Sequence, residues 1–224
     1  MQFLVLGKGK TGSLVAEIAG ERGHSARAFD INENQHASAL TAENLAGVDA
    51  VIDFTAPEAA AENIRAVLGH GSRIVVGTTG WYAHLDEMKS LAQQRGALLY
   101  GTNFSIGVQK LFRLTADLAK LDGYTFTIDE THHVTKLDAP SGTAITLREI
   151  VEAAHPGQKV EVTSHRVGDA MGEHIVTATG ANDTLELRHE ITSRRCLAEG
   201  AVRGAEWLAG KSGVFDFREI FEQL

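Results

Sequence analysis

The sequence predicts an α/β protein with a doubly wound parallel sheet in its first half, followed by a second α+β domain. Two observations predict this class. Short apolar runs alternate with helical patterns up to about residue 102, as they do in successive βαβ units. Beyond residue 103 the strand-like segments alternate apolar and polar residues instead, which is typical of a sheet with one exposed face.

Apolar runs that end in turn residues predict five parallel strands in the first half. They are expected at residues 2–7, 25–30, 49–55, 73–79 and 97–102. The first helix carries Leu14 and Ile18 on one face and closes at Gly23, and a second begins at Pro57 and reaches about Leu68. A third is expected over residues 83–95, closed by Gly96. Right-handed crossovers between such strands give a doubly wound sheet.

The second half is expected to hold helices at about 106–120 and 142–154 and a strand at 124–133. Three alternating segments, 159–166, 174–180 and 184–192, predict an open, mixed or mainly antiparallel sheet. An open sheet face of this kind favours self-association. The tail, from about Cys196 to Leu224, begins as a helix and is expected to pack back on the first domain.

Composition and charge exclude several function classes. The chain has 224 residues and a formal net charge of −8 without a run of Lys or Arg, which disfavours a nucleic-acid partner. Cys196 is the single cysteine, so an internal disulfide or a multi-cysteine metal site is excluded. The N-terminal residues lack a signal-peptide pattern and no stretch could span a bilayer, so we expect a cytoplasmic protein without membrane partners.

A glycine-rich loop follows the first predicted strand and opens the first helix. Gly7, Gly9 and Gly12 match G-x-G-x-x-G, with Lys8, Lys10 and Thr11 between them. The first glycine suits a tight turn, the second a close approach of a pyrophosphate, and the third close packing of helix on strand. Asp30 ends the second strand, where a carboxylate can bind ribose hydroxyls. The first half is therefore predicted to be a Rossmann-like dinucleotide-binding domain.

Asp30 also bears on the choice of cofactor. Its carboxylate would repel a 2′-phosphate, and Ile31 and Asn32 supply no cation beside it, so NADH is favoured over NADPH. Lys8, Lys10 and Arg27 act against that preference. Two other strand ends are candidate ring-binding positions, although ordinary strand-ending turns would look the same. They comprise Phe54, Thr55, Gly77, Thr78 and Thr79.

A second motif combines His132, His133 and Lys136 with a turn at Ser141-Gly142-Thr143. Adjacent strand residues point to opposite faces, which disfavours a metal chelate formed by the two histidines, and no metal is expected. An imidazole can donate a proton near neutral pH, Lys136 supplies a positive charge, and a helix N-terminus binds carboxylates. The motif therefore suits a small dicarboxylate substrate.

The chain resembles the family of 4-hydroxy-tetrahydrodipicolinate reductases, also called dihydrodipicolinate reductases, nearly from end to end. The resemblance lies in the glycine loop and in five further motifs: DFTAPE (53–58), GTTGW (77–81), TNFSIGV (102–108), HHVTKLDAPSGTA (132–144) and TSRRCLAEGAVRGAEWLAGKSGVFDF (192–217). The resemblance implies an NAD(P)H-dependent oxidoreductase of the diaminopimelate route to lysine. Such an enzyme transfers a hydride from NADH or NADPH to a cyclic conjugated imine dicarboxylate.

The resemblance also implies residue roles. His132 would be the general acid, His133 and Lys136 would bind and polarise the substrate, and Ser141, Gly142 and Thr143 would hold a carboxylate. The turn of Thr102, Asn103 and Phe104 would line the cofactor together with the residues named above. Residues 1–103 and about 196–224 would then bind the dinucleotide. Residues 104–195 would bind the substrate and build a homotetramer.

Three other functions remain open. A related amino-acid imine or amine dehydrogenase could use the same fold, and an aspartate-semialdehyde-type enzyme would use Cys196 as a nucleophile. A non-catalytic NADH sensor would need the dinucleotide site without the chemistry of His132 and Lys136.

Overall fold

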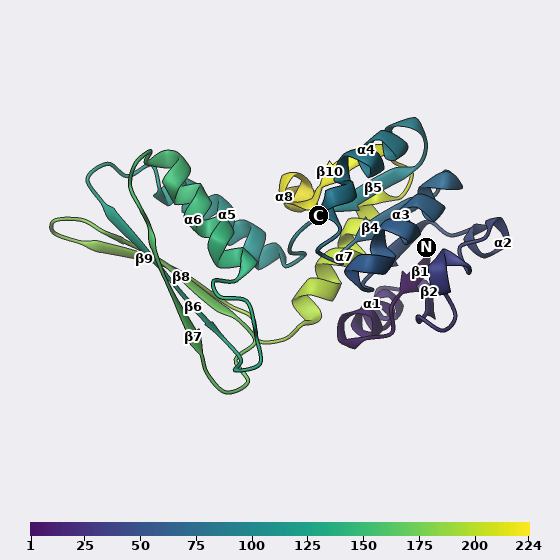
Figure 1. The fold of residues 1–224 in the computed structure, drawn as a ribbon, viewed down its shortest axis with the longest axis horizontal. Coiled ribbons are helices and arrows are strands. Elements are labelled where there is room, and N and C mark those ends of the chain that lie inside the picture. Colours follow the sequence, from purple (N-terminus) through teal and green to yellow (C-terminus); the bar gives the residue numbers. More distant parts are fainter. The chain divides into compact units, whose positions relative to one another are not determined.

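The structure, a computed structural model, describes residues 1–224 and consists of two compact units (Figure 1). Unit 1 comprises Met1–Ser105 and Arg195–Leu224, and unit 2 comprises Ile106–Arg194. The chain leaves unit 1 at the start of one helix and returns to it at the start of another. Each unit has a sheet and a hydrophobic core of its own.

Unit 1 contains a six-stranded, entirely parallel sheet, which confirms the predicted fold class. The five predicted strands are present, but each ends one to three residues before its predicted last residue. The order is β10-β5-β4-β3-β1-β2, with bounds β1 Gln2–Leu6, β2 Ser25–Phe29, β3 Ala50–Asp53, β4 Arg73–Val76, β5 Ala97–Tyr100 and β10 Gly213–Asp216.

Strand β10 was not predicted from the sequence. Its four residues lie in a tail expected only to begin as a helix, and they include only two apolar residues, Val214 and Phe215, which form no apolar run. The segment becomes a strand because it pairs in parallel with β5 at the edge of the sheet.

Helices cover both faces of this sheet, which explains why its strands read as continuous apolar runs. Leu4 and Leu6 of β1 share a core with Ile64 of α3 and Met88 of α4, while α1 packs beside α7. The helices are α1 Lys10–Glu21, α2 Ala42–Leu45, α3 Pro57–Gly69, α4 Leu85–Gln94, α7 Arg195–Leu208 and α8 Phe217–Ile220. Pro57 occupies the first turn of α3, as predicted.

Unit 2 contains a four-stranded mixed sheet in the order β7-β6-β8-β9. Strand β8 runs antiparallel to β6 and β9, whereas β7 runs parallel to β6. The parallel pair arises because α6 crosses over between β6 and β7. The bounds are α5 Ile106–Leu118, β6 Thr125–His132, α6 Gly142–Ala154, β7 Glu161–Arg166, β8 Glu173–Thr179 and β9 Thr184–Glu190.

One face of this sheet packs against α5 and α6. Phe112 of α5, Leu147 of α6, Ile128 of β6 and Val176 of β8 belong to one buried core. Strand β9 alternates exposed and partly buried residues, as expected of a sheet with one solvated face. Across the whole chain, no helix has the length and apolarity that crossing a bilayer requires.

Candidate active site

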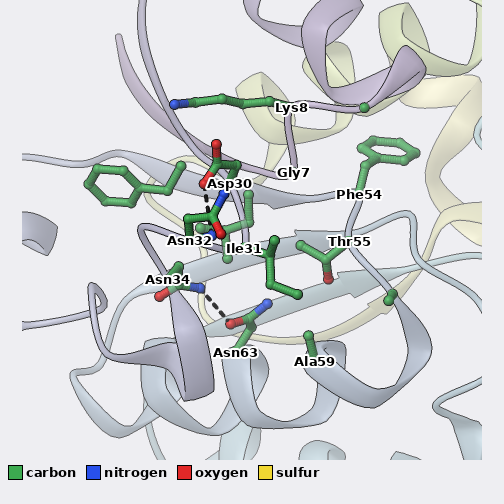
Figure 2. A pocket seen from close by; sticks show the side chains of 14 residues that line it. Gly7, Lys8, Asp30, Ile31, Asn32, Asn34, Phe54, Thr55, Ala59 and Asn63 are labelled. Atoms are coloured by element: carbon green, nitrogen blue, oxygen red, sulfur yellow. Dashed lines mark hydrogen bonds between the residues drawn. The ribbon is translucent and has the colours of Figure 1, made fainter.

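A pocket of about 450 Å³ lies at the carboxyl ends of β1, β2 and β3 in unit 1 (Figure 2). Its lining includes Gly7, Lys8, Asp30, Phe54 and Thr55, all predicted cofactor residues. A crevice outside the carboxyl ends of parallel strands is where open α/β sheets bind ligands. These five predicted cofactor residues therefore lie together at such a crevice.

A second pocket, also of about 450 Å³, lies at the ends of β3 and β4 and at the start of α1. It shares Gly9, Phe54 and Thr55 with the first pocket. The structure thus brings most of the predicted cofactor residues to two adjoining pockets. Eleven line one or both of them: Gly7, Lys8, Gly9, Lys10, Thr11, Asp30, Phe54, Thr55, Gly77, Thr78 and Thr79.

The three loop glycines differ in their surroundings. Gly7 has φ +96°, and a Cβ on it would lie 2.2 Å from the carbonyl oxygen of Phe54. A Cβ on Gly12 would lie 1.9 Å from the carbonyl oxygen of Gly7, whereas one on Gly9 would meet no atom within 4 Å. Gly7 and Gly12 therefore hold the turn against the neighbouring backbone. Gly9 leaves open space beside the pockets that it lines.

Helix α1 begins at this loop without a side-chain cap. The first N–H groups of a helix have no partner within the helix, and they attract anions. By contrast, Ser141 caps α6 through its side chain. The N-terminus of α1 therefore has the free donors that a pyrophosphate requires.

Asp30 and its neighbours order the turn after β2. Its Oδ1 accepts hydrogen bonds from the N–H groups of Asn32 and Glu33, at 2.8 and 3.2 Å. Glu33 in turn binds the Lys8 ammonium at 2.5 Å, which raises the pKa of Lys8. Arg27 donates to the carbonyl oxygen of Asn44 at 2.6 Å. Two of the cations that could favour a 2′-phosphate are thus bound to other groups.

A buried carboxylate, Asp53, lies beneath both pockets at the end of β3. Its Oδ1 accepts from the Thr55 hydroxyl and the Thr78 hydroxyl, each at 2.7 Å, and its Oδ2 accepts from Asn63 at 2.8 Å. Asn63 accepts from Asn34 at 2.9 Å (Figure 2). Burial raises the pKa of Asp53 despite these donors. Sequence reasoning missed this residue, although a carboxylate that ends a buried strand beside threonine is a detectable signal.

Four predicted cofactor residues line neither pocket: Gly12, Thr102, Asn103 and Phe104. Phe104 is 1% exposed, and its ring centroid lies 4.4 Å from that of Phe217. The Asn103 side chain accepts from the N–H of Ser105 at 2.8 Å. Thr102 is exposed.

In unit 2, His132 is the last residue of β6 and is 8% exposed. Its Nδ1 lies 3.4 Å from Oε2 of Glu130, and its ring centroid lies 5.1 Å from that of His174. His133, the next residue, is partly exposed and lies beyond the end of the strand, where its Nδ1 is 2.7 Å from the Thr135 hydroxyl. Only the first of the two histidines therefore belongs to the buried cluster.

Helix α6 begins beside this cluster. Ser141 donates its N–H to both carboxylate oxygens of Glu130 at 3.1 Å, and its hydroxyl accepts from the N–H of Ala144 at 3.2 Å. Gly142 is exposed and Thr143 is partly exposed. Ser141 itself is buried and its N–H is bound to Glu130, so only Gly142 and Thr143 of the three predicted residues are accessible at the start of α6.

Lys136 lies in the loop between β6 and α6. Its ammonium group binds both carboxylate oxygens of Asp138, at 2.7 and 2.9 Å. The same contact lowers the pKa of Asp138. Lys136 is therefore a positive charge whose present partner is a carboxylate.

Burial sets the protonation states of this cluster. It lowers the pKa of His132, helped by the charges of Lys136 and Arg166 and opposed by that of Glu130. It lowers the pKa of His174 to about 4. Burial also opposes ionisation of Glu130, but hydrogen bonds from Ser141 and Ser164 outweigh it and lower its pKa. The cluster is thus an ionised carboxylate between two imidazoles that favour the neutral form.

Glu130, His132 and His174 have the residue types of a metal site, and their ligand atoms lie within 4.8 Å of one another. The Glu130 carboxylate, however, already accepts hydrogen bonds from Ser141, Ser164 and Arg166. The Arg166 guanidinium, 3.2 Å from Oε1, already offsets the negative charge of this carboxylate and would repel a cation placed beside it. We therefore interpret the three residues as a hydrogen-bonded and electrostatic cluster.

Comparisons with known proteins agree with this architecture. The family model described as the N-terminus of dihydrodipicolinate reductase matches residues 1–104, and the model of its C-terminus matches residues 107–221. In overall fold, the chain superimposes on dipicolinate-bound dihydrodipicolinate reductase from Paenisporosarcina sp. TG-14 with a TM-score of 0.81. That likeness has 20% identity and covers 100% of this chain and 99% of the other.

Two curated relatives carry the name 4-hydroxy-tetrahydrodipicolinate reductase. The one from Christiangramia forsetii is 32% identical over 100% of this chain and 99% of its own length. The one from Natronomonas pharaonis is 37% identical over 98% of this chain and 99% of its own length. With both family models and full-length relatives in agreement, this chain belongs to the dihydrodipicolinate reductase family, whose members use a nicotinamide cofactor.

Proposed function

We propose that this protein is a 4-hydroxy-tetrahydrodipicolinate reductase. The net reaction consumes the hydroxylated cyclic imine dicarboxylate, NAD(P)H and a proton, and yields tetrahydrodipicolinate, NAD(P)⁺ and water. The proposal rests on the family membership and on a site in each unit that suits one part of this chemistry.

The residues of unit 1 fit a dinucleotide. The uncapped N-terminus of α1 and the open space at Gly9 suit the pyrophosphate, and Asp30 suits a ribose. Thr55 and Thr79 line the second pocket, whose size suits a flat ring. A bound nicotinamide cofactor supplies the hydride.

His132 is the proposed proton donor. As charge develops on the reduced ring, a protonated imidazole stabilises it by giving up its proton. The pKa of His132 is lowered in the free protein, so the imidazole needs the negative charge of an arriving dicarboxylate to take up a proton. Proton donation is thus coupled to substrate binding.

Lys136 and the N-terminus of α6 are the proposed seats for the carboxylates. Lys136 would exchange Asp138 for a substrate carboxylate, which keeps its ammonium charge paired throughout. Gly142 and Thr143, which are exposed and partly exposed, would bind a carboxylate at the positive end of the α6 dipole. His133 would add a contact from the partly exposed end of β6.

One observation carries the proposal: Oε2 of Glu130 lies 3.4 Å from Nδ1 of His132 and 3.1 Å from the N–H of Ser141. A single carboxylate therefore brings the proton donor and the carboxylate seat together. That pairing suits a small acidic substrate that must be both held and protonated.

The test is a steady-state assay on the condensation product of pyruvate and aspartate semialdehyde, followed by loss of NADH absorbance. His132→Gln is expected to lower kcat about a hundredfold or more, as loss of a general acid does. Because activity needs the protonated imidazole, the wild-type rate is expected to fall as the pH rises through the pKa of His132 in the complex.

The control is Cys196→Ala, which should retain the wild-type rate. Burial raises the pKa of the Cys196 thiol, which disfavours the thiolate that an aspartate-semialdehyde-type enzyme needs. Turnover of an amino-acid imine instead of the condensation product would favour an amine dehydrogenase. NADH binding without turnover of either compound would favour a sensor.

Three finer parts of the proposal concern cofactor, assembly and location. NADH is the preferred cofactor, because Asp30 lines the pocket while Lys8 and Arg27 are bound elsewhere. A homotetramer is expected, in keeping with the exposed residues on β7 and β9, and light scattering would measure its mass. The enzyme is expected to act in the cytoplasm, in keeping with the biosynthetic family to which the chain belongs.

A further inference from the structure

We propose that Glu130 is a positioning residue for the substrate site. It holds three parts of that site in place: the proton donor His132, the Lys136 loop and the N-terminus of α6. This inference deepens the proposed function and rests on it. It adds a residue that the motif of histidines and lysine does not include. The argument uses only residues of unit 2.

Glu130 is held rigidly inside the unit. It is 1% exposed, and its Oε1 accepts the Ser164 hydroxyl at 2.7 Å and the Arg166 guanidinium at 3.2 Å. Both partners lie on β7, which pairs with β6 in parallel. The orientation of the carboxylate is therefore set by the sheet itself.

The other carboxylate oxygen is directed at the two buried imidazoles. Oε2 lies 3.4 Å from His132 Nδ1 and 3.7 Å from His174 Nε2. Nδ1 of His132 is buried and makes no hydrogen bond. Glu130 thus acts on the His132 ring through its charge across a short gap, and favours the imidazolium over the neutral ring.

The same carboxylate controls where α6 begins. Its two oxygens accept the N–H of Ser141, the residue that caps the helix. The Ser141 hydroxyl lies 3.1 Å from His174 Nε2, which closes the cluster on its far side. Without the carboxylate, the N-terminus of α6 would lose its fixed position. The proposed seat for a substrate carboxylate would be displaced with it.

The Lys136 loop is tied to Glu130 indirectly. Arg166, which binds the carboxylate, also donates to the carbonyl oxygens of Lys136 and Asp138. The backbone on both sides of Leu137 is thereby fixed relative to β7. One buried charge therefore positions a proton donor, a cation and a helix terminus that lie on different segments.

The decisive variant is Glu130→Gln, which keeps the shape of the side chain and removes its charge. The charged groups around His132 are Glu130 on its own strand, Lys136 and Asp138 on the loop, Arg166 on β7 and His174 on β8. Without Glu130, the positive charges of Lys136 and Arg166 outnumber the negative charge of Asp138. The midpoint of the pH–rate profile is therefore expected to move down by roughly one unit.

We expect kcat to fall roughly tenfold or more in Glu130→Gln, while KM for NADH changes less than twofold. The pKa of His132 is measured separately by NMR titration of the free protein, where it should fall in the variant. Asp129→Asn is the matched control, because Asp129 is the neighbouring carboxylate on the other face of β6 and pairs with His165. It should leave the rate, the profile and the His132 titration unchanged.

A wild-type rate and an unshifted pH profile in Glu130→Gln would overturn the inference. Should this variant fail to fold, Ser164→Ala removes only one donor to the carboxylate and should shift the profile in a smaller, measurable way; no shift there would also overturn it. If the wild-type protein shows no turnover, the proposed function fails. The NMR titration then still decides whether Glu130 controls His132.

Discussion

Lys8 lines the proposed nucleotide pocket, but its ammonium group is bound to Glu33 at 2.5 Å. Glu33 also accepts a hydrogen bond from the N–H of Asp30. One side chain therefore both orders the turn after β2 and pairs with the ammonium group of Lys8, which is then less available to a ligand in the pocket. At this scale, we expect the choice between NADH and NADPH to depend on which partner Lys8 has, in addition to the charge of Asp30. The sequence shows the presence of Lys8 but not its partner.

Glu33→Gln should therefore improve the use of NADPH. With its partner neutralised, Lys8 becomes available to a 2′-phosphate, and we expect the ratio of kcat/KM for NADPH to that for NADH to rise roughly fivefold to tenfold. The double variant Glu33→Gln with Lys8→Met is the control and should lose the gain. A single variant whose ratio equals that of the wild type would contradict this role for Lys8.

At the scale of elements, α1 and the loop before it depend on contact between two glycines. A Cβ on Gly12 would lie 1.9 Å from the Gly7 carbonyl oxygen, a backbone atom that cannot move without the turn. Gly12 thus supports the pocket from behind, although it does not line it. Asp53 also supports the pockets without lining them, because its hydrogen bonds with Thr78 and Asn63 connect the ends of β3 and β4 to α3.

Gly12→Ala should displace the start of α1 and weaken dinucleotide binding at least tenfold, with about 1–3 kcal/mol of lost stability from overpacking. Gly20→Ala is the matched control on the same helix, because a Cβ there meets no atom within 4 Å. That change should leave binding unchanged and raise stability slightly, since alanine is the better helix former. Calorimetric titration with NADH and urea unfolding measure both effects, and equal behaviour of the two variants would count against the packing argument.

At the scale of the whole molecule, the two units differ in their response to acid. Unit 2 contains His174, which is 2% exposed and whose pKa burial lowers to about 4. The unfolded chain takes up this proton near pH 6.5, whereas the folded chain does so only near pH 4. The stability due to the neutral imidazole is therefore fully present above pH 6.5 and is lost as the pH falls toward 4.

Unit 2 should accordingly unfold first in acid, with roughly 3 kcal/mol of its stability lost across that interval. Both tryptophans, Trp81 and Trp207, lie in unit 1, so their fluorescence reports on that unit alone. Hydrogen exchange in β6 and β8 should accelerate between pH 6.5 and 4 while the tryptophan emission stays native. Exchange that keeps its ordinary pH dependence there, or a loss of both signals together, would refute this ordering.

Much of the fold followed from local patterns. Buried parallel strands are continuous apolar runs, and their helices are marked by Pro57 at one start and by Gly23 and Gly96 past two ends, so these elements were predictable. Strand β10 was not, because its pairing with β5 decides its conformation, and the direction of β7 was not, because it depends on how the chain crosses over through α6. Within the site, the glycine loop and the histidine motif were visible as sequence strings. Glu130, Asp53 and His174 were not, because their importance comes from burial.

The sequence by itself determined the order of the elements up to α7, the family, and the residue types that each site contains, because periodicity and short motifs are local properties of the chain. Only the tertiary structure decided which carboxylate faces which imidazole and which lysine is already paired. It also revealed that one buried glutamate contacts residues from four segments of unit 2. Those facts depend on contacts between residues up to 44 positions apart, from Glu130 to His174, and on the exclusion of water around them.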